Sequence, residues 1–146
     1  AGQYLLFDFP GQVELFTHSG TVRSIVQKLL KHDFRLTAVN LVDSHYCQDH
    51  AKYISVVMLS LNIMLQLELP HVNVLSKMDL IEAEGPLEFP LETFTEVLDP
   101  ERIVDSLESD PRTRRYAKLS RAIATVLEDY SFVQFHVLNI QDKESV

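Results

Sequence analysis

Short apolar runs alternate along this chain with longer segments of helical periodicity, and this alternation constrains the fold more than any other feature. The short runs have the length of buried strands, and the longer segments place apolar residues three and four positions apart, as one face of a helix does. Strands are expected at residues 3–7, 36–42, 71–75 and 132–138. Helices are expected at residues 20–32, 49–69, 100–107 and 112–129.

The order of these elements, with strands and helices in turn, is typical of α/β proteins built on a mainly parallel sheet. We therefore predict a three-layer α/β fold with helices on both faces of the sheet. Ligands of such sheets bind beyond the carboxyl ends of the strands. The polar residues that directly follow each predicted strand are consequently the first candidates for a functional site.

The composition excludes several classes of protein. The net charge of −8 at pH 7 disfavours a nucleic-acid-binding surface, because binding to phosphates needs clustered Lys and Arg. Cys47 is the single cysteine, so it forms neither an internal disulfide nor a zinc site on its own, and a reducing intracellular compartment is the default. Polar residues interrupt the most apolar stretch, 53–69, so it does not read as a membrane span.

A D-x-x-G pattern follows the first predicted strand. Asp8 at the strand end can hold a Mg²⁺-bound water, and Gly11 lets its backbone N–H approach a γ-phosphate because no Cβ is in the way. Gln12, directly after the glycine, can orient an attacking water. The alternative interpretation is a Pro-Gly turn that only leads the chain out of the strand.

The segment Ser76-Lys77-Met78-Asp79 follows the third predicted strand and is similar to the guanine-reading motif [NT]-K-x-D. A carboxylate such as that of Asp79 can accept two hydrogen bonds from N1–H and the exocyclic amine of guanine, a donor pair that adenine lacks. The stem of Lys77 can lie along the base. Ser76 replaces the usual asparagine and cannot bridge with two ends as an amide does. The alternative is a polar exit loop in which Asp79 caps a helix over residues 80–84.

Asn139 follows the fourth predicted strand, where nucleotide hydrolases of this kind carry a third base-contacting loop. Its alternative interpretation is a turn residue that bonds to its own backbone. The second predicted strand also ends in polar residues, 43–45, but they match no motif. The order of the three motifs is more informative than any one of them, because each follows a strand and helices separate them. Together they favour a nucleotide site at one edge of the sheet.

The residues around these motifs resemble the GPN-loop GTPases. That family carries the pattern D-x-P-G-Q-x-E, and every fixed position of it is present from Asp8 to Glu14. Residues 41–47, 68–80 and 127–145 also resemble the family, most closely its second eukaryotic paralogue type. The resemblance implies a P-loop-NTPase-like fold and the binding and hydrolysis of GTP, with GTP or GDP and Mg²⁺ as the bound groups.

The resemblance also implies roles for individual residues. In the catalytic part, Asp8 would serve the magnesium and water network, Gly11 would approach the γ-phosphate, and the attacking water would be positioned and polarised by Gln12 and Glu14. The residues implied for base binding are Ser76, Lys77, Asp79 and Asn139.

For partners, the resemblance implies a dimer around the nucleotide, formed with a second copy or with a paralogue. It further implies a role in the assembly and nuclear import of RNA polymerase II. The location that follows is cytoplasmic, with shuttling to the nucleus. Neither direct nucleic-acid binding nor a membrane partner is implied.

Two defining parts of that family have no counterpart in these 146 residues. They are the phosphate-cradling P-loop, GxxxxGK[ST], and the Gly-Pro-Asn insertion, both of which would lie before residue 1. We therefore expect residues 1–146 to be the carboxy-terminal part of a single GTPase domain, incomplete at the N-terminus, with 86–111 as a helical, acidic, insertion-like segment. Because the P-loop supplies most of the phosphate affinity, we expect this chain alone to be a poor enzyme.

Two other functions stay open at this point. The first is a non-catalytic assembly or interaction module, which would hold a partner through the acidic segment 82–110 and exposed helix faces, with nucleotide only as a regulator. The second is an ATPase of the same architecture. Asp79 argues against an ATPase, because a carboxylate repels the N1 acceptor of adenine.

Overall fold

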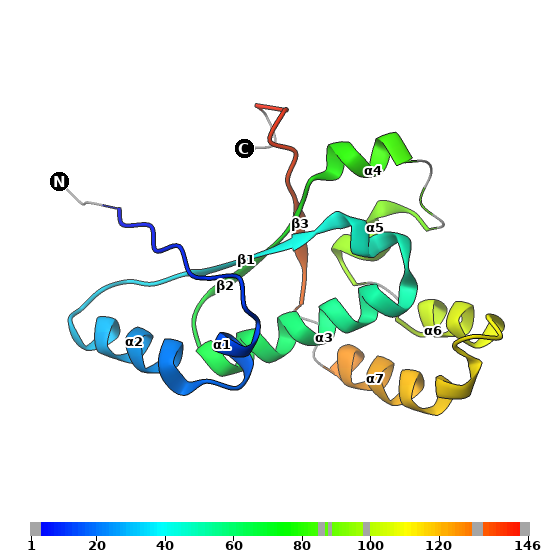
Figure 1. Ribbon diagram of the computed structural model, residues 1–146, viewed down its shortest axis with the longest axis horizontal. Helices are drawn as coiled ribbons and strands as arrows, with labels where there is room; N and C mark the ends of the chain where they lie inside the picture. Colours follow the sequence, from blue (N-terminus) through cyan, green and yellow to red (C-terminus); the bar gives the residue numbers. More distant parts are fainter. Residues whose placement is uncertain (1–3, 85–86, 88, 98–99, 130–132, 144–146) are drawn as a thin grey trace.

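The computed structural model describes residues 4–84, 87, 89–97, 100–129 and 133–143. Its strands are β1 (Ala38–Asp43), β2 (His71–Ser76) and β3 (Phe135–Val137). Its helices are α1 (Glu14–Thr17), α2 (Gly20–Lys31), α3 (His50–Leu67), α4 (Met78–Glu84), α5 (Leu91–Thr95), α6 (Pro100–Ser109) and α7 (Ala117–Asp129), with short 3-10 helices η1 (Ser44–Gln48) and η2 (Arg114–Tyr116). Figure 1 shows their arrangement.

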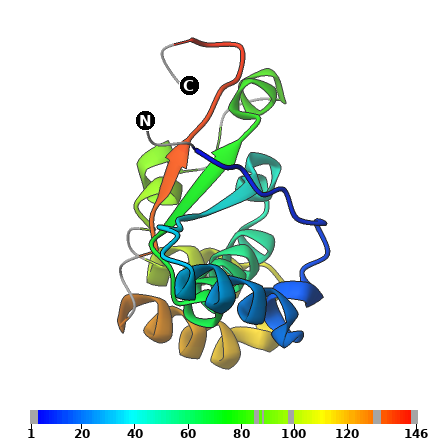
Figure 2. The ribbon, with the colours of Figure 1, turned by 90° about the vertical axis from the view of Figure 1, so that its left-hand side faces the viewer.

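The strands form one sheet in the order β1-β2-β3, and both neighbouring pairs are parallel. Asp43 lies opposite Ser76, so β1 and β2 end level with each other. Figures 1 and 2 show the sheet with α3, α6 and α7 gathered together beneath it. The predicted α/β class and the parallel sheet are confirmed, and each of these strands falls at one of the expected apolar runs.

The strand expected at residues 3–7 is wrong for the part that the structure describes. Residues 4–10 form an irregular extended segment, and Tyr4 and Leu6 are each 99% exposed. An apolar run becomes a strand only where a neighbouring strand offers unpaired backbone groups and a buried face. Within the described ranges, β1 pairs with β2 alone, and residues 4–10 do not add to its outer edge. Residue 3 lies outside the described residues.

The main core lies on the side of the sheet that faces α3. It joins Val42, Leu75 and Phe135 of the strands to apolar side chains of α3, α4, α5, α6 and α7. The opposite side of β1 is open, since Val39 is 60% and Leu41 is 65% exposed. None of the helices among the described residues has the length and apolar character needed to cross a membrane.

A polar network inside the core joins the strands to α3. The Asn40 side-chain amide donates to the Ser60 hydroxyl and to the Asn73 side-chain oxygen, at 3.0 Å in each case. Asn73, only 2% exposed, donates in turn to the backbone carbonyl of Gln134 at 3.3 Å. Because a buried amide is costly when it lacks a partner, a slip of either strand pair would leave these groups unsatisfied. The Asn40–Asn73 and Asn73–Gln134 bonds therefore fix the strand register, whereas the Ser60 hydroxyl ties β1 to α3.

Side-chain caps mark the starts of two of the expected helices. The Ser19 hydroxyl accepts from Thr21 N–H at the start of α2, and the Asp49 carboxylate accepts from the first-turn N–H groups of α3. The helix expected at 49–69 ends at Leu67, because Glu68 takes a left-handed conformation just before Pro70. The helix expected at 112–129 begins instead as η2 and becomes α-helical at Ala117.

His71, at the start of β2, gives the fold a predicted pH dependence. Neither ring nitrogen has a hydrogen-bond partner among the described residues, and burial lowers the pKa of His71 below its ordinary 6.5. Well above pH 6.5 the ring is neutral in both the folded and the unfolded chain and has no effect on stability. Below it, the unfolded chain binds a proton that the fold resists, so stability falls as the pH drops towards the folded pKa.

We expect His71→Phe to flatten this dependence. Urea unfolding at about pH 7.5 and about pH 5.5 measures how much the free energy of unfolding falls on acidification. This fall should be larger in the parent protein than in His71→Phe, by less than about 1.4 kcal/mol, the value of one pKa unit. An equal loss of stability in both proteins on acidification would mean that His71 is not the group responsible.

Candidate functional site

The carboxyl ends of the strands bring two of the expected motifs together. β2 runs directly into the segment Ser76–Asp79, and the N–H of Leu138, just past β3, donates to the Leu75 carbonyl at 2.8 Å. Asn139 therefore lies beside the end of β2. Parallel strands end at the same edge of a sheet, which is where α/β folds bind ligands.

Lys77 occupies the turn between β2 and α4. Its backbone is left-handed, with φ of 63°, and its ammonium group lies 2.6 Å from the Asp43 carboxylate at the end of β1. Hydrogen bonds from Lys77 and from the backbone N–H of His45 hold the pKa of Asp43 below its usual value, and the same carboxylate raises the pKa of Lys77. Lys77 is thus charged and held at one side of the edge.

Asp79 lies in the first turn of α4 with a partly exposed side chain. α4 begins at Met78, so Asp79 is inside the helix and is not its cap, as the alternative interpretation of this segment had it. No hydrogen bond or ion pair from another described residue engages its carboxylate. A carboxylate that no other described residue engages therefore lies at the edge.

Ser76 and Asn139 already bond to the backbone. The Ser76 hydroxyl donates to the Val42 carbonyl at 3.1 Å and so bridges β2 to β1. The side-chain oxygen of Asn139 accepts from Gln141 N–H at 2.9 Å, and the Asn139 carbonyl accepts from Asp142 N–H at 3.1 Å. Asn139 therefore acts as a turn residue in this structure, as its alternative interpretation predicts.

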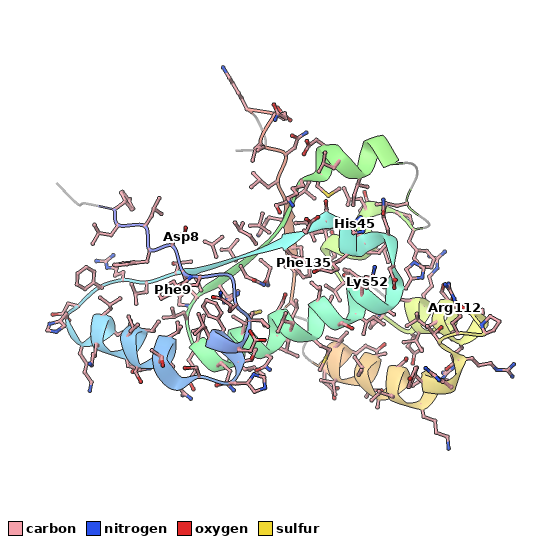
Figure 3. All side chains as sticks on the ribbon, viewed as in Figure 1. Asp8, Phe9, His45, Lys52, Arg112 and Phe135 are labelled. Atoms are coloured by element: carbon pink, nitrogen blue, oxygen red, sulfur yellow. The ribbon has the colours of Figure 1, made fainter. Side chains whose placement is uncertain are left out.

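The D-x-x-G segment lies elsewhere. Phe9, next to Asp8, packs in a second apolar cluster with Leu36 and Ala38, at the beginning of β1. A six-residue strand spans about 16 Å, so this position is far from the carboxyl edge. Figure 3 shows Asp8 on the side where β1 begins and His45 beyond its other end. The structure does not bring the two motifs into one site.

The remaining residues of that segment are exposed and unengaged. Gly11 and Gln12 precede α1, and Glu14 is its first residue. No described residue pairs with the side chains of Asp8, Gln12 or Glu14. A Cβ built on Gly11 meets nothing within 4 Å, so packing in this structure does not require glycine there.

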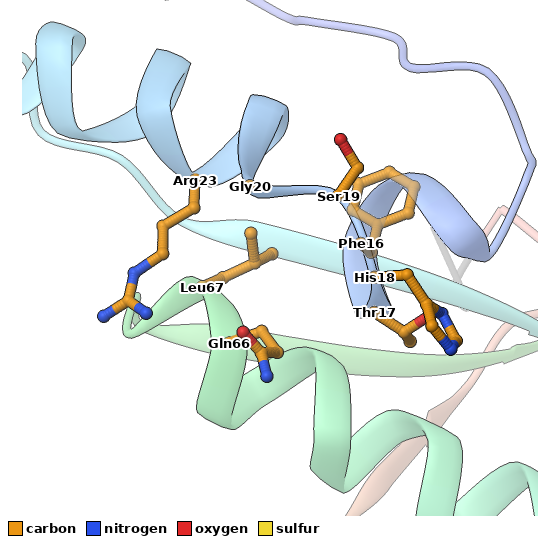
Figure 4. Close-up of a pocket in the computed structure, with 8 residues that line it drawn as sticks. All are labelled: Phe16, Thr17, His18, Ser19, Gly20, Arg23, Gln66 and Leu67. Carbon is orange, nitrogen blue, oxygen red and sulfur yellow. The ribbon is translucent and has the colours of Figure 1, made fainter.

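A small pocket of about 120 Å³ lies away from the carboxyl edge (Figure 4). Its lining comes from the α1–α2 connection, Arg23 of α2 and the last residues of α3. Binding pockets for small molecules are several times larger, commonly about 300–1,000 Å³. Neither its size nor its position relates it to the strand-end motifs.

The whole chain, residues 1–146, matches the model of a protein family described as "Conserved hypothetical ATP binding protein". It is 58% identical over 143 residues to GPN-loop GTPase 2 of Danio rerio, covering 98% of this chain and 46% of that protein. It is 50% identical over 143 residues to the GPN-loop GTPase 2 homolog of Dictyostelium discoideum, with 98% and 45% covered. GPN-loop GTPase 2 of Saccharomyces cerevisiae is 41% identical over 147 residues, with 98% and 42% covered.

The chain belongs to the GPN-loop GTPase family. Its resemblance to that family is confirmed, and nucleotide binding is the function that the family carries. The chain spans about half the length of the curated relatives that it matches. The names differ on the base, since the family model is described by ATP and the relatives by GTP. The chemistry of Asp79 bears on that difference.

The described side chains fit the groups that GPN-loop GTPases imply to different extents. For a guanine base, the edge offers a free carboxylate at Asp79 and the stem of Lys77, which fits. For Mg²⁺, the described residues contain no cluster of three metal-ligating side chains. Mg²⁺ at nucleotide sites commonly uses one or two carboxylates, waters and the phosphates themselves, so Asp8 alone fits as a single contributor.

Sequence reasoning missed the contribution of Asp43 and Ser44. Asp43 is the partner of Lys77, and the Ser44 hydroxyl donates to the Lys77 carbonyl at 3.0 Å. Two signals pointed towards them: they follow a predicted strand, and residues 41–47 resemble the GPN-loop GTPases. No motif assigned them a partner, because the partner lies 33 or 34 positions away in the sequence.

Proposed function

We propose that this chain forms the base-binding and water-positioning part of a domain that binds and hydrolyses GTP. The observation that carries the proposal is the Asp79 carboxylate. It lies at the carboxyl edge of a parallel sheet, in the first turn of a helix, and no described residue engages it. A free carboxylate at that place matches the donor pair of guanine.

The base would lie between the Asp79 carboxylate and the Lys77 stem. Asp79 would accept from N1–H and from the exocyclic amine, which fixes the base in its plane. The ammonium of Lys77 is held by Asp43 at 2.6 Å, so its methylene stem is presented in one direction. Ser76 would contribute through the backbone, since its hydroxyl already donates to Val42, and Asn139 would contribute through the turn that it closes.

The hydrolytic side would be formed by Asp8, Gly11, Gln12 and Glu14. Their distance from the edge in this structure follows from the exposed run 4–7, which finds no sheet neighbour among the described residues. We propose that in a protein of the relatives' length this run is buried as a strand, which moves Asp8 to a strand end. Mg²⁺, when bound, would neutralise phosphate charge, with Asp8 holding one of its waters.

Calorimetry with GDP and ADP, in the presence of Mg²⁺, tests the proposal. The protein is produced at the length of its relatives, and the 146-residue chain is measured beside it. We expect the longer protein to bind GDP about 100-fold more tightly than ADP or better, because two charge-assisted hydrogen bonds separate the bases. We expect the 146-residue chain to bind both weakly and to hydrolyse GTP poorly. Equal binding of GDP and ADP by the longer protein would overturn the proposal.

Gly11→Ala separates function from packing. Because the space around Gly11 is open, alanine should leave the stability unchanged or raise it by about 0.4–1 kcal/mol through the unfolded chain. In the longer protein, the added methyl group should block the approach of the backbone N–H to the γ-phosphate. We expect weaker binding of a non-hydrolysable GTP analogue with unchanged GDP affinity. Equal losses for both nucleotides would contradict a γ-phosphate contact.

Gln12→Ala decides between an enzyme and an interaction module. If Gln12 positions the attacking water, GTP turnover by the longer protein should fall by about 100-fold while GTP affinity is retained. Gln27→Ala, at an exposed position of α2, is the matched control and should not change turnover. Unchanged turnover in the Gln12 variant would remove Gln12 from the mechanism. If the Gln12 variant still bound its partners and supported their assembly without GTP turnover, that result would favour the interaction module.

The proposed partners follow from family membership. We propose a dimer around the nucleotide, formed with a second copy or a paralogue, and a role in RNA polymerase II assembly and nuclear import from the cytoplasm. Sedimentation with GDP and with a GTP analogue tests the dimer, and binding to purified polymerase subunits tests the client. A monomer in both nucleotide states that binds no subunit would overturn both.

A further inference from the structure

Ser44, at the corner between β1 and η1, has no part in the function proposed above, although it lies against the base-reading segment. Ser44 is 1% exposed, and its hydroxyl donates to the Lys77 carbonyl at 3.0 Å. The N–H of Leu80 donates to the same carbonyl, also at 3.0 Å. Since Ser44 is shielded from solvent, water cannot readily replace its hydroxyl. The Lys77 carbonyl therefore depends on these two donors.

Lys77 needs such support because of its backbone. A φ of 63° places it in the left-handed region, which is unfavourable for a residue with a Cβ and persists only where the surroundings hold it. This residue is the turn between β2 and α4. Asp79 follows two positions later, so the conformation of Lys77 sets the direction in which the Asp79 carboxylate leaves the sheet.

Two further bonds join the same two corners. The Lys77 ammonium donates to one oxygen of the Asp43 carboxylate at 2.6 Å, while the other oxygen accepts from the His45 N–H of its own corner at 3.0 Å. The Ser76 hydroxyl donates to the Val42 carbonyl at 3.1 Å. The ion pair is partly exposed, whereas the Ser44 hydroxyl is buried, so Ser44 is the contact that solvent screens least.

We propose that Ser44 is a positioning residue for base recognition: its hydroxyl holds the Lys77 carbonyl and so fixes the left-handed turn that directs the Asp79 carboxylate at guanine. Asp43 assists by holding the Lys77 side chain. This inference rests on the proposed function, because it assigns Ser44 a role only where Asp79 reads the base.

The test compares GDP with IDP, whose base lacks the exocyclic amine, in the protein at the length of its relatives. The parent protein should bind GDP about tenfold more tightly or better, because IDP loses one charge-assisted hydrogen bond to Asp79. In Ser44→Ala the turn is no longer held, and the ratio of the two affinities should fall severalfold towards one. Alanine keeps the shape of serine without the oxygen, so the core stays packed.

Ser60→Ala is the matched control. Ser60 is also 1% exposed and hydrogen-bonded, to Asn40 at 3.0 Å, but it lies in α3 away from the edge. Its ratio should equal that of the parent. An unchanged ratio in Ser44→Ala, or an equal fall in Ser60→Ala, would overturn the role of Ser44. A parent protein with no preference for GDP over IDP would instead overturn the proposed function itself.

Discussion

Asp79→Asn should weaken GDP binding by about 30- to 1,000-fold in the protein at the length of its relatives, and xanthosine diphosphate should become the preferred ligand. In the proposed function the carboxylate accepts two charge-assisted hydrogen bonds from guanine, each worth about 1.5–3 kcal/mol, and asparagine can replace only one with a neutral bond. Its amide group then faces the exocyclic amine of guanine, donor against donor. Xanthine carries an oxygen at that position and accepts the new hydrogen bond.

Competition between the two diphosphates, followed by calorimetry, measures this switch. No described residue engages Asp79, so the substitution should leave the free energy of unfolding nearly unchanged. Glu101→Gln removes a charge from the first turn of α6 and is the control for charge alone. Retained GDP affinity in the Asp79 variant would mean that Ser76–Asp79 is not the segment that reads the base.

Local signals were sufficient to predict α2, α3 and α6 and the strands β1, β2 and β3. α2 was expected at 20–32 and is found at Gly20–Lys31, because both its cap, Ser19, and its buried stripe lie within one short stretch. The same holds for β2, an apolar run between Pro70 and a polar turn. The residues that determine where such elements begin and end lie within them or directly beside them in the sequence.

What failed was the prediction that depends on a neighbour. Residues 4–7 have the composition of a buried strand, but a strand also needs a partner edge, and composition does not reveal which edge is available. The observed position of Asp8 differs from the expected one for the same reason, because Asp8 was expected at the end of that strand. The segment Ser76–Asp79 and Asn139 lie near each other because β2 and β3 are parallel neighbours, so their carboxyl ends meet at one edge of the sheet.

The contacts that hold the segment Ser76–Asp79 are equally beyond local reasoning. Ser44 and Lys77 are 33 residues apart, and neither periodicity nor a motif relates a serine to the carbonyl of a distant lysine. The polar residues after the predicted strands indicated the edge of the sheet where this hydrogen bond lies, but not which two residues form it. Asn139 shows the opposite case, because its bond to the backbone two residues on is a local property of asparagine and was foreseen as an alternative.

The other large expected effect concerns the segment 86–111, which the sequence presents as acidic and insertion-like. Phe94 of α5 is fully buried, with its ring edge-on to Tyr53 at 5.0 Å between centroids, and its carbonyl accepts from the Tyr53 hydroxyl at 2.8 Å. Phe94→Ala should cost about 3–5 kcal/mol, a large share of a total that is typically about 5–15 kcal/mol. Urea unfolding of the 146-residue chain measures it.

Two variants separate the possible causes of that loss. Tyr53→Phe keeps the ring contact and removes only the hydroxyl, which leaves the Phe94 carbonyl without this buried donor, so we expect a smaller cost of about 1–3 kcal/mol. Leu119→Ala truncates an apolar side chain that is 58% exposed, and its cost should stay within about 0.5 kcal/mol. If Phe94→Ala cost no more than Leu119→Ala, then α5 would not belong to the core. The buried ring instead places α5 in the core that packs against α3 and β3, behind the carboxyl edge of the sheet.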